Sequence, residues 1–433
     1  MSLRSLRRSL LNSRLWILLA IIGPGIITAN ADNDATGILG YSLAGVQFGY
    51  AMLWVLVLST FALGIAQEIC ARMGAVTGKG LADLIREEYG VKITFLAMAT
   101  LLVANFATTI AEFAGITAAI QVFTPPSLYI YVRFLAMPLV GLGVWFMVVK
   151  GTYRGVEKIL LGASLIYLSY IVSAYLAHPP WFTVLRETVA PDMSHIGPLT
   201  PYIFMVINVI GTTITPWGQF YVQSAVRDKG IKAEEYGYER ADVLFGSFFT
   251  NFIAFFIIVC CAKAIYFHPE LHITNLNDAG QAALALRPVA GELATALFAI
   301  GLFNASCFGA IIVPLSTAYA VTEALGWESG VGRRLREAPL FIGVYSFLIL
   351  TAVIVVMLFP NHLTMLMILP NIIGGALLPI ILVLMQLLSS KRRLMGDYVN
   401  SKTFNTIAWI STIILTLLSL ILLVTQLFPI GSP

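Results

Sequence analysis

The chain has few charged residues, few cysteines and few histidines, and each shortage excludes a class of protein. Charged residues make up 11% of its 433 residues, whereas soluble domains contain about 25%. The four cysteines have no C-x-x-C spacing, which argues against a thiolate metal site and favours core packing. None of the five histidines falls in a predicted membrane span, so no imidazole is available there to relay protons.

Long apolar runs are abundant instead. Hydrophobic residues make up 58% of the chain, and the mean hydropathy is +0.87. A helix of about 20 apolar residues is long enough to cross the hydrocarbon core of a bilayer. The sequence therefore predicts an all-α polytopic membrane protein, a single transmembrane domain over residues 1–433. Its eleven predicted spans are residues 15–42, 49–72, 93–121, 129–150, 156–177, 200–227, 241–266, 289–324, 338–358, 363–389 and 403–428.

The basic residues indicate the orientation of these spans. With the N-terminus placed in the cytoplasm, 22 of the 26 lysines and arginines fall in cytoplasmic segments, as the positive-inside rule requires. Residues 1–14 then form a cytoplasmic segment of a plasma or inner membrane protein, and the C-terminus lies outside. The net charge of +4 reflects this topology rather than nucleic-acid binding. Arg240 and Asp242, at the edge of the seventh span, are expected to form an ion pair.

The middle of the first predicted span is unusually polar. Asp32 and Asp34 lie there among glycines, although a carboxylate at bilayer depth costs several kcal/mol. A loop does not explain them, because residues 15–38 make only one span. Glycine weakens the helix, and carbonyls freed in lipid need a partner, which a bound cation can supply. We therefore predict Asp34 as the main cation ligand, whereas Asp32 would face elsewhere on a continued helix.

The sixth predicted span contains a second interruption, around residues 211–218. Pro216 removes a backbone donor and disfavours helical geometry at Thr215. Two interrupted helices five spans apart are typical of inverted-repeat transporters that bind their cargo at the membrane midplane. We therefore predict a first repeat over residues 15–177, a second over 200–389 and a peripheral helix over 403–428.

The predicted ligands are all oxygen atoms. They are the Asp34 carboxylate, the Thr215 hydroxyl and the backbone carbonyls of Ala31 and Thr212, and Gly37 also belongs to the predicted metal site. Such a set suits hard cations such as Mg²⁺, Mn²⁺ or Ca²⁺, with water completing the shell, and a sodium site would look similar. The spans contain no H-E-x-x-H motif and no convincing nucleophile–base pair, so we expect no enzyme activity and no resident cofactor.

Three motifs resemble those of the Nramp family of divalent-metal transporters. They are GPG-x8-D followed by FGY and LW in the first two spans, TPWGQFYVQS in the sixth, and RRLMGDYVNS after the tenth. The resemblance covers essentially the whole chain. It implies the LeuT-type fold, with two inverted five-helix repeats and one further helix, and transport of Mn²⁺ or Fe²⁺ with protons.

The chain departs from the family pattern where the cargo is chosen. The family motif D-P-G-N falls on residues 34–37, which keeps Asp34 but places Gly37 where the asparagine ligand would be. The motif M-P-H falls on residues 215–217, so Thr215 replaces the metal-binding methionine and Trp217 replaces the histidine. Loss of the thioether removes the ligand that favours transition metals over Mg²⁺.

The resemblance also implies a proton route, and this chain has fewer acidic residues along it than the family pattern. The family motif D-L-A-E falls on residues 109–112, where Thr109 replaces the aspartate and only Glu112 remains acidic. Glu112 is expected either to pair with a neighbouring helix or to relay protons. Asn371, in the tenth span, is a candidate to face the waters of the ion.

These observations predict import of a partly hydrated divalent cation, Mg²⁺ or Mn²⁺, by alternating access with weak or no proton coupling. The pattern looks like the Nramp-related branch that includes magnesium transporters. We expect a monomer whose partners are the cation and the bilayer. Two alternatives remain: a proton-coupled Mn²⁺/Fe²⁺ symporter, and a sodium-coupled transporter of a small organic substrate with the same fold. The acidic side chain in the first interruption disfavours an anionic organic substrate.

Overall fold

The computed structural model describes residues 23–268, 276, 279–360 and 362–427. The predicted segment 1–14, the start of the first predicted span and His272 therefore lie outside the described residues. The described chain consists of helices joined by turns and short 3₁₀ or π segments, without a strand. The all-helical prediction is confirmed.

The helices follow the predicted spans closely. Each predicted span overlaps at least one described helix, and the ends of most differ from the prediction by only a few residues. The helices are α3 (Pro24–Ala31), α4 (Ala35–Phe48), α5 (Leu53–Thr77), α6 (Leu81–Val122), α7 (Tyr129–Tyr131), α8 (Met137–Val149), α9 (Tyr153–Ser164), α10 (Leu168–Leu176), α11 (Trp181–Val189), α12 (Leu199–Thr213), α13 (Pro216–Lys229), α14 (Tyr236–Cys261), α15 (Ala279–Leu325), α16 (Pro339–Leu358), α17 (Leu363–Ser389), α18 (Arg392–Met395) and α19 (Lys402–Leu427).

Nine helical segments of the described chain are long and apolar enough to cross a membrane, judged by length and composition. Two adjacent predicted spans merge in this count, because Ala35–Thr77 is one helical run of 43 residues. In α17, only Leu378–Ser389 qualifies, as a shorter apolar helix. The chain is thus an integral membrane protein, and the predicted number of eleven spans stays a prediction.

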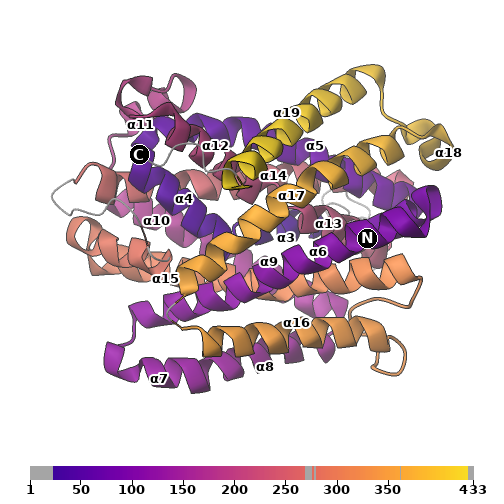
Figure 1. The fold of residues 1–433 in the computed structure, drawn as a ribbon, viewed down its shortest axis with the longest axis horizontal. Coiled ribbons are helices and arrows are strands. Elements are labelled where there is room, and N and C mark those ends of the chain that lie inside the picture. Colours follow the sequence, from indigo (N-terminus) through magenta and orange to yellow (C-terminus); the bar gives the residue numbers. More distant parts are fainter. Residues whose placement is uncertain (1–22, 269–275, 277–278, 361, 428–433) are drawn as a thin grey trace, which may run out of the picture.

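Two long helices, α6 and α15, pack against each other in the centre of the molecule (Figure 1). Both bend near their N-terminal end at a glycine with positive φ, 77° at Gly90 and 82° at Gly291. An L-residue with a side chain rarely adopts this conformation, whereas glycine does so at little cost. Each bend redirects a helix that is 42 or 47 residues long.

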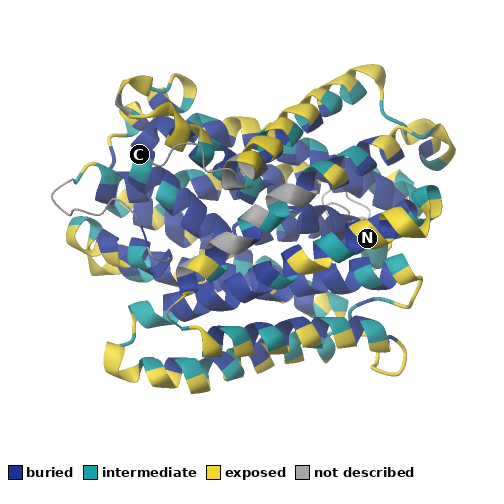
Figure 2. Ribbon diagram, viewed as in Figure 1, coloured by how far each residue is buried: buried dark blue, intermediate teal, exposed yellow. Residues whose placement is uncertain are grey.

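Burial separates the central helices from the peripheral ones. The side chains of α3, α4 and the inner faces of α6, α13 and α15 are mostly buried, whereas α8, α16 and α19 expose one face (Figure 2). The exposed faces carry large apolar side chains, for example Leu139, Phe347 and Ile410. Such faces suit contact with lipid tails, which satisfy apolar side chains as well as a protein core does.

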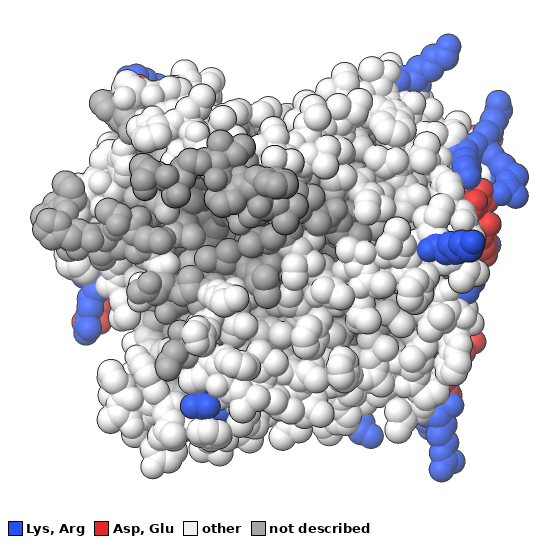
Figure 3. Space-filling view, viewed as in Figure 1, with Lys and Arg blue, Asp and Glu red and all other residues white. Residues whose placement is uncertain are grey.

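Ion pairs gather at one end of the molecule, which we call the basic end. Lysines and arginines project mainly from the right-hand end in Figure 3, beside acidic side chains. The first turns of α6 supply the acidic partner in five of these pairs. The pairs are Lys79–Glu87, Arg86–Asp83, Arg227–Asp83, Lys391–Glu88 and Arg393–Glu88. The predicted orientation makes this end cytoplasmic.

Asp242 has a different role from the ion pair expected for it. Its Oδ2 accepts hydrogen bonds from the backbone N–H groups of Gly23, at 3.0 Å, and Gly25, at 2.7 Å. No ion pair with Arg240 is found among the described residues. Since the first N–H groups of a helix have no partner within it, the carboxylate holds the start of α3 against α14.

Candidate cation site

The first interruption consists of Asp32, Asn33 and Asp34, between the end of α3 at Ala31 and the start of α4 at Ala35. Asp34 is the N-cap of α4. Its Oδ1 accepts hydrogen bonds from the Gly37 N–H and the Thr36 hydroxyl, both at 2.7 Å. Its Oδ2 is buried and has no hydrogen-bond partner. Asp34 is only 1% exposed. One oxygen of this carboxylate therefore fixes the turn, and the other is left for a ligand.

Asp32 is also buried and points across to the other interruption. Its Oδ1 accepts a hydrogen bond from the Thr215 hydroxyl at 2.7 Å, and its Oδ2 accepts one from Gln67 at 3.3 Å. The expectation that Asp32 faces elsewhere assumed a continued helix, and residues 32–34 are not helical. Sequence reasoning thus missed Asp32, although its charge inside an apolar span was a visible signal.

The second interruption consists of Ile214 and Thr215, between α12, which ends at Thr213, and α13, which begins at Pro216. Proline at the first helical position is favourable because that N–H would have no helical partner. The Thr215 hydroxyl is not used to cap α13, since it donates to Asp32. The depth of both interruptions in the bilayer stays a prediction.

Gly37 and Thr212 bring the two interruptions close together. A Cβ atom built on Gly37 would lie 3.5 Å from the Thr212 Oγ1 and 3.3 Å from Asp34 Oδ1. The Thr212 hydroxyl is buried and has no hydrogen-bond partner. Ala31 and Thr212 both lie at C-terminal ends of helices, where the helix dipole favours a cation.

Glu112 of α6 lies against the first interruption. Its Oε2 accepts a hydrogen bond from the N–H of Ala35 at 3.1 Å, whereas its Oε1 is buried without a partner. Because Ala35 directly follows Asp34, this bond places the Glu112 carboxyl beside Asp34. The Thr109 hydroxyl donates instead to the Asn105 carbonyl of its own helix at 2.7 Å. Thr109 and Glu112, the first and last residues that the D-L-A-E motif covers, thus have different hydrogen-bond partners.

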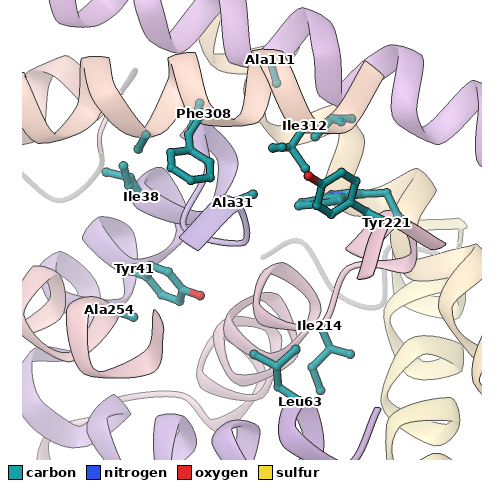
Figure 4. Close-up of a cluster of buried hydrophobic side chains, with 14 of the residues drawn as sticks. Ala31, Ile38, Tyr41, Leu63, Ala111, Ile214, Tyr221, Ala254, Phe308 and Ile312 are labelled. Carbon is teal, nitrogen blue, oxygen red and sulfur yellow. The ribbon is translucent and has the colours of Figure 1, made fainter. Parts of the chain in front are cut away.

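A small cavity connects the two interruptions. It has about 20 Å³ of space open to the centre of a water-sized sphere, enough for one such particle and too little for an organic substrate. The residues that line it are Asp34, Thr36, Ala104, Asn105, Thr108, Gly211, Thr215, Pro216, Trp217, Pro370, Asn371 and Gly374. Apolar side chains from α3, α4 and α15, including Ala31, Ile38 and Phe308, exclude water around the interruptions (Figure 4).

Two of the more remote predicted residues, Asn371 and Trp217, line the cavity. Asn371 lines it while its amide donates to Asn208 at 3.2 Å. Trp217 also lines it, and its indole N–H is buried without a partner. Sequence reasoning missed Asn105 and Thr108, because polar residues inside apolar helices more often bond to their own helix.

The site has no basic counterion. Among the described residues, no lysine, arginine or histidine forms an ion pair with Asp32, Asp34 or Glu112. The described residues also contain no cluster of three histidine, cysteine, aspartate or glutamate side chains that could enclose a metal. The arrangement therefore offers negative charge and single oxygen ligands, which suits an ion that keeps some of its water and leaves again.

Comparison with known proteins identifies a family and a fold. The Nramp family, described as natural resistance-associated macrophage protein-like, matches residues 25–425. A variant of the manganese transporter of Eremococcus coleocola is similar, with a TM-score of 0.75 and 21% identity over 97% of this chain and 90% of that one.

Two further solved structures have the same arrangement of helices. The same transporter in complex with an aromatic bis-isothiourea substituted compound gives a TM-score of 0.74 and 22% identity, covering 98% of this chain and 90% of that one. MhsT in complex with L-phenylalanine gives 0.60 and 15%, covering 96% and 98%. At these identities the likeness shows the fold alone, an all-helical LeuT-like arrangement.

Proposed function

Because the chain belongs to the Nramp family, we propose that it transports a divalent metal cation and that Asp34 is the main ligand of this cargo. The observation that carries the proposal is the unpartnered Oδ2 of Asp34, buried beside a cavity with no basic side chain to neutralise it. A buried carboxylate without a partner is costly, and a cation removes that cost when it binds. The carbonyls of Ala31 and Thr212, with the Thr215 hydroxyl, are the further proposed ligands.

The proposed cargo is Mg²⁺ or Mn²⁺. The proposed ligand atoms are all oxygens, and Thr215, which lines the cavity, stands where the family pattern has a methionine. Hard oxygen ligands do not discriminate against Mg²⁺ as a thioether would. Since the cavity holds about one water-sized particle, a partly hydrated ion requires the two interruptions to move apart during the cycle.

The proposed mechanism is alternating access between two inverted repeats, residues 15–177 and 200–389. The matching bends of α6 and α15 support this proposal, because these helices are the third of each predicted repeat. In this scheme the N-terminus and the basic end are cytoplasmic. A doubly charged ion that crosses the whole membrane inward gains about 4.6 kcal/mol per 100 mV, which can drive uptake without a coupled proton.

Proton-coupled transport of Mn²⁺ or Fe²⁺ is the second candidate. Glu112 favours it, because this buried carboxyl is near Asp34 and keeps one oxygen unpartnered. A proton shared between the two carboxyls would be displaced when a cation binds to Asp34. The family membership supports a transporter rather than an enzyme in either case.

Metal uptake into proteoliposomes tests the proposal. Purified protein is reconstituted with a metal-sensitive dye and a pH dye inside, and Mg²⁺ and Mn²⁺ are added outside under an imposed potential. We expect entry of both ions, its loss in Asp34→Ala, and no matching internal acidification. Asp397→Ala, which removes an exposed aspartate, is the matched control and should transport as the unmodified protein does.

Each contrary result contradicts a different part of the proposal. Unchanged uptake by Asp34→Ala would remove Asp34 as the main ligand. Entry of Mn²⁺ alone, with matching acidification, would instead establish the proton-coupled candidate and contradict our reading of Thr215 and Trp217.

A further inference from the structure

One face of α13 carries a line of polar side chains from the cavity to the basic end. Thr215, Gln219, Gln223 and Arg227 follow one another at intervals of four residues. Residues at this spacing on a helix lie one above the other. The first three are buried, at 8%, 0% and 0% exposed. Polar side chains buried inside a membrane protein are costly, so a line of them indicates a function.

Both glutamines leave an oxygen unpartnered. Their amide nitrogens donate to backbone carbonyls, Gln219 to Thr215 at 3.5 Å and Gln223 to Lys79 at 2.9 Å. Their Oε1 atoms are buried and accept no hydrogen bond. An unpaired buried amide oxygen costs about 1–3 kcal/mol. Water or a cation that binds to these two oxygens would remove that cost.

An ion pair closes the line at its far end. Arg227 lies 2.8 Å from Glu323 of α15 and 3.7 Å from Asp83 of α6, and the Ser224 hydroxyl also donates to Glu323 at 2.7 Å. The Glu323 side chain is only 1% exposed. On the other side of these residues is an open cavity of about 560 Å³, which Arg227, Asp83 and Glu323 help to line.

We propose that the cation leaves the Asp34 cavity along the face formed by Thr215, Gln219 and Gln223, and that the Arg227–Glu323 pair is the barrier before the open cavity. This route rests on the proposed function. Neutral amide oxygens suit a path rather than a resting site, because they ease the loss of water without holding the ion tightly. In this proposal the Asp34 carboxylate binds the cation, and the amide oxygens of Gln219 and Gln223 line the path along which it leaves.

Substitutions in the line should slow uptake without weakening binding. Gln219→Leu and Gln223→Leu each remove an amide while Asp34 stays intact. We expect the rate of Mn²⁺ uptake to fall about 10-fold, the effect of losing one contact of hydrogen-bond strength at the barrier. The Kd of Mn²⁺, measured by calorimetry on the purified protein, should stay within about 2-fold, because these variants leave the proposed ligands around Asp34 unchanged.

Gln386→Leu is the matched control. Gln386 of α17 is also buried, its amide donates to Asn405 at 2.7 Å, and its Oε1 is likewise unpartnered. It lies outside the proposed path, so its uptake rate should equal that of the unmodified protein. A fall in Gln386→Leu as large as in the two line variants would mean that any buried glutamine matters, which overturns the route.

Gln223→Glu gives a second test that does not depend on a leucine variant that folds. The added carboxylate has the same size and should hold the cation on the path, so that Mn²⁺ binds more tightly while its uptake slows. Normal uptake and normal affinity in this variant would overturn the proposal. The Asp34→Ala variant separates the two levels: if it alone abolishes uptake and binding while the glutamine variants behave normally, the function stands and the route is wrong.

Discussion

Each interruption separates two consecutive helices, α3 from α4 and α12 from α13, but the two differ in the residues that they contain. The first contains two carboxylates and no proline, whereas the second has no charge and is followed by Pro216, the first residue of α13. In the first, Asp34 caps the helix that follows it. In the second, the Thr215 hydroxyl leaves its own helix uncapped and donates to Asp32.

Under the proposed function, the first interruption would supply charge to the cation and the second would supply the shape of its site. A cation between them would be attracted by Asp34 and by the C-terminal ends of α3 and α12. The N-terminal end of α13 would repel it, but Thr215 directs its hydroxyl proton toward Asp32, which leaves the hydroxyl lone pairs available for the ion. The first two of the following predictions each change one interruption, and the last changes both.

The largest effect should come from Asp34→Asn, which removes charge from the first interruption and keeps its shape. Asparagine caps helices as well as aspartate does, so the melting temperature in detergent should barely change. The affinity for Mn²⁺ and the uptake rate should fall by about 100-fold or more, because even loss of a residue that only supports a metal ligand costs about 10- to 100-fold. Asp34→Ala should lose affinity equally and in addition lose about 1 kcal/mol of stability with the cap.

Calorimetry and thermal unfolding on the same samples check both halves of this prediction. An asparagine variant that binds Mn²⁺ normally would show that the charge of the first interruption is not what attracts the cation, and the comparison between the interruptions would lose its basis.

A smaller effect should come from Thr215→Met, which gives the second interruption a soft ligand. A thioether favours Mn²⁺ and other transition metals over Mg²⁺, and we expect the preference for Mn²⁺ to rise about 10-fold. Competition of Mg²⁺ against Mn²⁺ uptake measures it. Thr215→Leu has similar bulk without sulfur and should leave the preference unchanged, so an equal rise in both variants would assign the change to shape alone.

Some features of the two interruptions could be predicted from the sequence, and others could not. Asp34 and Pro216 could be recognised because a carboxylate or a proline inside an apolar span has few structural explanations. The bond between Asp32 and Thr215 could not, because it joins positions 183 residues apart whose meeting depends on the whole helix arrangement. The capping of α3 by Asp242 was missed for the same reason, since local sequence favoured a pair with Arg240.

The smallest effect should come from substituting both partners of the Asp32–Thr215 hydrogen bond. This experiment measures directly whether the two interruptions are energetically coupled. Asp32→Asn, Thr215→Val and the double variant form a cycle. We expect a coupling of about 1 kcal/mol in the free energy of unfolding and a similar coupling in the binding of Mn²⁺, because the bond holds the ligands of both interruptions in place.

The Trp145–Ser346 hydrogen bond supplies a control cycle. It joins α8 to α16 at 2.7 Å, away from the cation cavity. Trp145→Phe and Ser346→Ala should couple in the free energy of unfolding but not in the Kd of Mn²⁺. If the Asp32–Thr215 cycle behaves in the same way, that bond only stabilises the fold, and the two interruptions bind the cation independently of each other.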